Sequence, residues 1–134
     1  MEERNESGYS EGRKHTLRSR ELMIGNFVKQ KYDDKQIEIV NGAMIHNAHM
    51  FYGIPLTEEW LIKFGFENKG HGSSDNIYYK QEEFLNWGHR VIMSDIAIVL
   101  QHGFMNQWSE LASLKYVHQL QNLYYSLCFE ELTI

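Results

Sequence analysis

The clearest hydrophobic pattern lies near the end of the chain. Apolar side chains recur there at helical spacing, at Leu114, Val117, Leu120, Tyr124 and Leu127. Residues three and four positions apart share one face of an α-helix. The pattern therefore predicts a helix over residues 116–127 whose apolar face packs on the rest of the chain or on a partner.

A second, shorter helix is predicted to begin after Thr57. Thr57 is a good N-cap residue, and Glu58 and Glu59 follow it in the first turn, where the helix dipole favours negative charge. Gly65 can adopt the left-handed conformation that ends many helices. Three side chains of this helix are expected to face the core: Trp60, Leu61 and Phe64.

The first strands are predicted before this helix. Residues 22–30 are mostly apolar, with Gly25 as a bulge or a point of close approach, and residues 36–40 alternate between polar and apolar. Asn41-Gly42 is a strong hairpin signal, and residues 43–45 would follow it as a third strand. This region is expected to form a meander of three antiparallel strands.

Further strands are predicted over residues 77–80 and 90–100, with the continuous apolar run at 96–100 in a central place. Residues 81–88 fit either a loop or a helical turn, and residues 102–108 are expected to be a turn that leads to the last helix. This order of elements predicts an α+β fold, with small antiparallel sheets, a short central helix and a longer C-terminal helix.

A chain of 134 residues is the size of one domain. Residues 1–19 are polar and charged, which predicts a flexible tail, and residues 20–134 are expected to form a single α+β domain. No apolar run is long enough to span a membrane, and no signal peptide is visible. A soluble cytoplasmic protein is therefore expected, and the single cysteine, Cys128, suits a reducing compartment.

The charge balance is acidic. The chain has 13 Lys and Arg against 18 Asp and Glu, a net charge of −5. Broad binding to duplex nucleic acid needs clustered basic residues that displace counterions, so nucleic acid is the less favoured partner.

No catalytic motif or cofactor-binding motif is visible. His46 and His49 have a spacing that could bind a metal ion, but a zinc site needs a third ligand and none lies at a recognisable interval. His118 is expected to be a partly exposed helix residue. His89 and His102 lie beside glycines in predicted turns, which is an ordinary place for histidine.

Aromatic residues are the remaining lead. They come in doublets such as Tyr78-Tyr79, and a doublet on a strand sends one ring inward and the other outward. Outward aromatic rings are typical of protein interfaces, although they could equally complete a small core. The predicted partner-binding residues are Tyr78, Tyr79, Glu82, Glu83, Trp87 and Trp108.

Three stretches resemble a family of small uncharacterised proteins found in bacteria, prophages and mobile elements. They are residues 21–28 (ELMIGNFV), 53–66 (GIPLTEEWLIKFGF) and 116–127 (YVHQLQNLYYSL), the last followed by Glu130-Glu131-Leu132. The resemblance implies no catalytic residues. Cys128-Phe129 replaces the Thr-Gly more common in these relatives, so the last helix is expected to end without a glycine cap.

These observations favour a non-enzymatic protein-binding accessory protein of phage or mobile-element type. Its partner would be a host protein such as a nuclease or a ribonucleoprotein effector, which it would inhibit in the manner of an anti-CRISPR protein. The second hypothesis is a nucleic-acid-binding accessory protein. The third is a small metal-dependent enzyme that uses His46 and His49.

Overall fold

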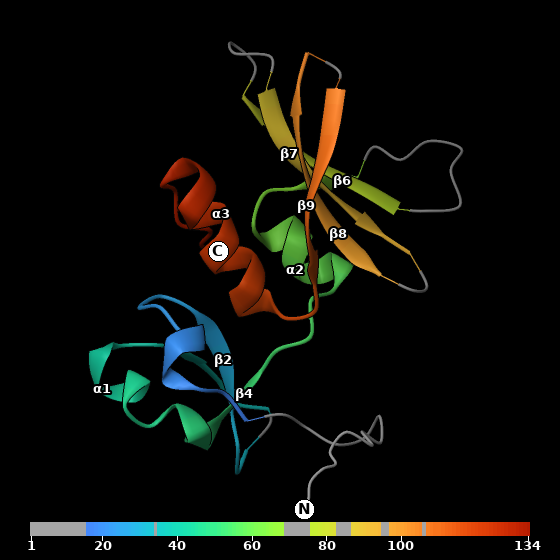
Figure 1. Cartoon of the computed structure of the whole chain (residues 1–134). Helices are drawn as coiled ribbons and strands as arrows, with labels where there is room; N and C mark the ends of the chain where they lie inside the picture. The colour runs from blue at the N-terminus through green and yellow to red at the C-terminus, as the bar shows by residue number, and fades with distance from the viewer. Residues whose placement is uncertain (1–15, 34, 69–75, 83–86, 95–96, 106) are drawn as a thin grey trace, which may run out of the picture. The chain divides into compact units, whose positions relative to one another are not determined.

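The fold is α+β, as predicted (Figure 1). The computed structural model describes residues 16–33, 35–68, 76–82, 87–94, 97–105 and 107–134. The chain divides into two compact units, Met1–Ile54 and Pro55–Ile134, called here the first and the second unit. The expectation of one domain over residues 20–134 stays a prediction.

The first unit contains a three-stranded antiparallel sheet in the order β3-β2-β4. Strand β2 (Phe27–Gln30) lies between β3 (Ile37–Ile39) and β4 (Phe51–Gly53). The predicted meander is therefore wrong, since a meander would place the second strand in the middle. Single turns of 3-10 helix, Ser19–Glu21 and Ala48–Met50, complete the unit.

The Asn41-Gly42 pair starts a helix instead of a hairpin. The side-chain Oδ1 of Asn41 accepts a hydrogen bond of 3.0 Å from the backbone N–H of Met44, which caps α1 (Gly42–Ile45). Residues 43–45 are thus helical, and the predicted third strand there is wrong. Asparagine is favourable both at a helix N-cap and in a tight turn. The contacts of the residues that follow it determine which of the two structures forms.

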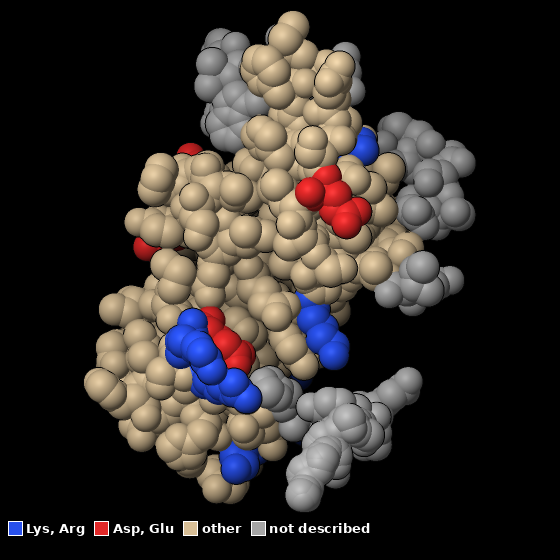
Figure 2. All heavy atoms as spheres, in the orientation of Figure 1, with Lys and Arg blue, Asp and Glu red and all other residues tan. Residues whose placement is uncertain are grey.

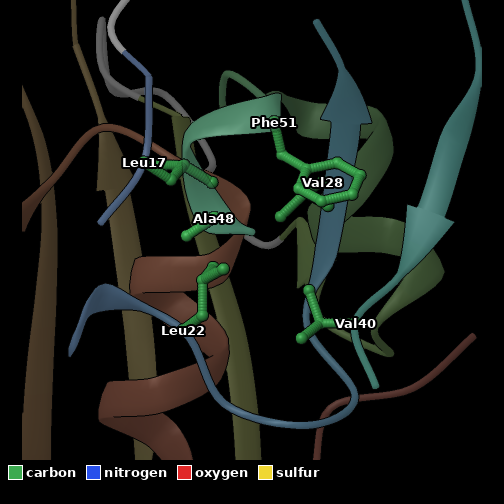
Figure 3. Close-up of a cluster of buried hydrophobic side chains, with 6 residues drawn as sticks. All are labelled: Leu17, Leu22, Val28, Val40, Ala48 and Phe51. Atoms are coloured by element: carbon green, nitrogen blue, oxygen red, sulfur yellow. The ribbon is translucent and has the colours of Figure 1, made fainter. Parts of the chain in front are cut away.

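Six buried side chains form a hydrophobic cluster in the first unit, as Figure 3 shows: Leu17, Leu22, Val28, Val40, Ala48 and Phe51. Leu17 is only 2% exposed, and Thr16 pairs with Tyr52. The flexible tail was predicted over residues 1–19, and its C-terminal boundary is wrong, because the side chain of Leu17 is packed into this cluster. Residues 1–15 of that tail lie outside the described residues.

The second unit holds a five-stranded antiparallel sheet in the order β5-β6-β7-β8-β9. Its strands are β5 (Glu67–Asn68), β6 (Asn76–Glu82), β7 (Trp87–Met93), β8 (Ile98–Phe104) and β9 (Gln107–Leu114). Of residues 81–88, which were predicted as a loop or a helical turn, residues 81–82 and 87–88 belong to strands. A helical turn is therefore excluded for these four residues. The predicted turn over residues 102–108 is mostly strand, with Met105 at a positive φ of 52° between β8 and β9.

Two helices complete the second unit, α2 (Glu58–Lys63) and α3 (Val117–Cys128). The predicted position of α2 is confirmed, since the helix follows Thr57, and Trp60, Leu61 and the C-cap residue Phe64 are buried. Thr57 occupies the N-cap position without a side-chain cap hydrogen bond. Gly65, which follows Phe64, has a positive φ of 95°.

Helix α3 buries most of its predicted stripe, including Val117, Leu120 and Tyr124. Leu127 is 40% exposed, so the stripe ends one turn earlier than predicted. His118 was predicted to be partly exposed, but it is buried, with its ring stacked on Tyr116. Phe129 follows the helix in the left-handed conformation, so the helix ends without a glycine, as predicted.

Candidate functional site

The five-stranded sheet has an inner face that its two helices contact. The Tyr78 hydroxyl on β6 donates a hydrogen bond of 2.5 Å to Glu58 of α2. On the same face of β7, the ring of His89 packs edge-on against Tyr124 of α3, with ring centroids 5.2 Å apart. Because side chains alternate along a strand, the neighbours of Tyr78 and His89 point the other way.

These neighbours form the outer face of the sheet. Strand register places Tyr79, Arg90 and Gln101 in one row across β6, β7 and β8. It places Ile77, Ile92 and Val99 in the next row. With Trp108 of β9, these seven half-buried residues define the outer face.

Arg90 is the centre of the polar contacts on the outer face. Its Nε donates a hydrogen bond of 2.6 Å to Oε1 of Gln101, and its Nη1 donates one of 3.3 Å to the hydroxyl of Tyr79. The guanidinium carbon lies 4.2 Å from the centroid of the Trp108 ring, the distance of a cation–π contact. All these contacting groups are neutral. The same row of the register continues to a carboxylate on each side, because Glu67 of β5 is the partner of Tyr79 and Glu110 of β9 is the partner of Gln101.

The aromatic rings on this face also contact each other. The rings of Tyr79 and Trp108 pack edge to face, with centroids 5.7 Å apart. Trp108 lies over Gly103, its register partner on β8, where a Cβ atom would come within 2.4 Å of the indole Cε3. Glycine at position 103 therefore gives the indole room to lie across the sheet.

Of the predicted partner-binding residues, the structure brings Tyr79 and Trp108 together on the outer face. The prediction that Tyr78 contacts a partner at the surface is wrong, because its side chain is 1% exposed and faces α2. Glu82 and Trp87 are register partners at the ends of β6 and β7. The structure describes the backbone of these two residues but not their side chains. Glu83 lies outside the described residues.

Sequence reasoning missed Arg90 and Gln101, although one signal was present. Arg90 is a charged residue directly before the apolar pair Val91-Ile92 in a predicted strand. A positively charged side chain at this position in a strand needs neighbouring side chains that accept its hydrogen bonds or stack on it. The register that supplies these neighbours is not visible in the sequence.

Two histidines that were expected in turns form a pair on neighbouring strands. His89 and His102 are register partners on β7 and β8, and Nε2 of His89 lies 3.3 Å from Nδ1 of His102. Burial, and secondarily the charge of His102, lower the pKa of His89 to about 4. A buried imidazole that stays neutral at ordinary pH is suited to packing between sheet and helix.

The described residues offer no support for the metal-site hypothesis. His46 ends α1, and His49 lies in the following turn of 3-10 helix, both exposed. Among the described residues, no group of three or more His, Cys, Asp and Glu side chains is placed to hold a metal ion.

The charge of the chain is concentrated in the second unit. Residues 55–134 contain ten acidic and five basic residues, whereas residues 1–54 contain eight of each. Within each unit, the described Lys and Arg side chains on the face drawn in Figure 2 do not form a continuous track. The second unit thus carries the whole net charge of −5.

None of the helices in the described part of the chain is long and apolar enough to cross a membrane. No protein-family model, curated protein or solved structure matches this chain. The resemblance to small phage and mobile-element proteins therefore stays an expectation.

Proposed function

We propose that this chain is a non-enzymatic protein-binding module that uses the outer face of its five-stranded sheet. The observation that carries this proposal is the packing of Tyr79, Arg90 and Trp108 on the face opposite the helices. Tyrosine, tryptophan and arginine are the residue types most enriched among the energetic hot spots of protein interfaces.

The geometry of the outer face favours association. Arg90 is already held by Gln101 and by the two aromatic rings, so less side-chain freedom is lost when a partner binds. Ile77, Ile92 and Val99 supply an adjoining apolar row, which a partner can cover with side chains of its own.

The charge distribution indicates two features of the partner. The net charge of −5 on the second unit attracts a protein with a basic surface and accelerates their encounter. At the contact itself, Arg90 favours a carboxylate or a carbonyl group. A host nuclease or ribonucleoprotein effector fits the first feature, because such proteins bind nucleic acid through basic surfaces, and inhibition of one is the specific form of this proposal.

The test compares capture of host proteins by matched variants. The wild-type chain, the double variant Arg90→Gln/Trp108→Ser and the control Tyr32→Ser are immobilised and exposed to host lysate. Tyr32 is an aromatic residue of the first unit that is 78% exposed. We expect a protein retained in stoichiometric amount by the wild type and the control, and at least about tenfold less by the double variant.

Circular dichroism of all three proteins checks that they are folded. No retained protein, or equal retention by the folded double variant, would count against the proposal.

Nucleic-acid binding is the second candidate, and one observation favours it. Aromatic rings and an arginine on the face of a sheet are also the arrangement on which single-stranded bases stack. The acidic charge of the second unit opposes it. Fluorescence anisotropy with labelled single strands at low salt separates the two functions, and the protein-binding proposal expects no change.

A further inference from the structure

We propose that the first unit binds a small planar aromatic carboxylate in a hollow beside β2 and α1. This hollow has a volume of about 590 Å³ and is lined by described residues between positions 30 and 51. Pockets for small molecules usually measure about 300–1,000 Å³. The site belongs to the first unit alone and does not depend on the outer face of the sheet.

Apolar side chains from the edge of the core form part of the lining. Met44 and Met50 are half-buried and pack against the hydrophobic cluster of the first unit, and Phe51 is a buried member of that cluster. Thioether side chains adapt their shape and make favourable contacts with aromatic rings. This part of the lining therefore favours a flat aromatic group.

An exposed aromatic ring also lines the hollow. Tyr32 is 78% exposed, and the ammonium group of Lys31 lies 5.8 Å from the centroid of its ring. A tyrosine with so much of its surface in water has a large apolar area to gain from stacking on a ligand.

The polar part of the lining favours an anion over a cation. Lys31 is the one side chain with a permanent charge among the described lining residues, and none of these residues is an aspartate or a glutamate. The Oδ1 atom of Asn41 already accepts from the backbone of Met44, which leaves the NH2 group of this side chain as a donor. An ammonium group and an amide N–H are suitable partners for a carboxylate.

The probe is 2-naphthoate, with 2-naphthylmethylammonium as the matched cation. Both are titrated into the full ¹⁵N-labelled chain and followed by amide chemical shifts. For a ligand of this size, about −0.3 kcal/mol per heavy atom corresponds to a dissociation constant of about 1 mM. We expect saturable shifts gathered in residues 30–51 with the carboxylate, and affinity at least about tenfold lower for the cation.

Two lysine variants test the charge. Lys31→Gln should weaken naphthoate binding about threefold to tenfold, as expected for one charge-assisted contact at a partly exposed site. Lys29→Gln is the control, because Lys29 lies on β2, two residues before Lys31, but does not line the hollow. The affinity of this variant should match that of the wild type.

Three results would overturn the inference: no saturable shifts, shifts scattered over both units, or equal affinity for the two probes. Equal weakening by the two lysine variants would overturn it too. The proposed protein-binding function can fail without affecting this titration, because its residues lie in the second unit.

Discussion

At the scale of single residues, His89 links the structure to pH. It is 1% exposed, next to His102 and the Tyr124 ring, and its pKa in the folded chain is about 4. An unfolded histidine has a pKa near 6.5. As the pH falls from 6.5 to 4, the unfolded chain therefore binds a proton that the folded chain excludes, and the folded state loses roughly 3 kcal/mol of stability.

Urea unfolding at pH 7 and pH 5 measures this effect. Over that interval we expect the wild type to lose about 2 kcal/mol more than His89→Phe, which cannot titrate. The control His46→Gln replaces an exposed histidine and should follow the wild type. An identical pH dependence for wild type and His89→Phe would show that the imidazole is not held neutral by its surroundings.

Gly103 is the second residue with a specific consequence. A Cβ atom at this position would lie 2.4 Å from the Trp108 indole, so Gly103→Ala must displace the ring or strain the strand. We expect a loss of about 1–3 kcal/mol in the free energy of unfolding, typical of overpacking. Gly42→Ala is the control, since nothing lies within 4 Å of its new Cβ, and it should not destabilise the chain. If both variants unfold at the same urea concentration, Trp108 does not need the space above Gly103.

Part of the candidate site could be predicted from residue types alone. The rule that an aromatic doublet on a strand splits between two faces is confirmed by Tyr78 and Tyr79. Which ring points inward could not be predicted, because Ile77 and Lys80 on either side do not favour one face clearly. That choice depends on the position of Glu58, 20 residues away in sequence.

At the scale of elements, the two longer helices were predictable because their signals are local. Thr57, the acidic first turn and Gly65 define α2, and the apolar spacing defines α3. Strand β9 was missed because most of its residues are exposed, and because a register shift opposite Leu100 and Gln101 inserts Leu111 and breaks the alternation of apolar and polar side chains. Helix α1 was missed because Asn-Gly also suits a hairpin.

Helix α3 is expected to be the main stabilising element of the inner face. Leu120 is fully buried on α3, so Leu120→Ala should cost about 2–5 kcal/mol in the free energy of unfolding. Leu127→Ala on the same helix is the matched control and should cost less than about 1 kcal/mol, since Leu127 is 40% exposed. Similar losses measured by urea unfolding for both variants would contradict the assignment of the buried stripe.

At the scale of the whole molecule, the two units differ in charge and in the site each provides. The first unit has no net charge and contains the hollow beside β2 and α1. The second unit has a net charge of −5 and contains the outer face of the five-stranded sheet. The sequence showed an acidic body, but the boundary after Ile54 has no linker composition to mark it. Only the contacts within each unit make this division visible.

The central claim, that the outer face binds a protein, is tested most directly by site-specific photo-crosslinking in host cells. The photoreactive amino acid p-benzoylphenylalanine replaces Val99 on the outer face in one variant and the exposed Tyr32 of the first unit in another. We predict a light-dependent adduct with one host protein from position 99 and none from position 32. No adduct from position 99, or the same adducts from both positions, would contradict the claim.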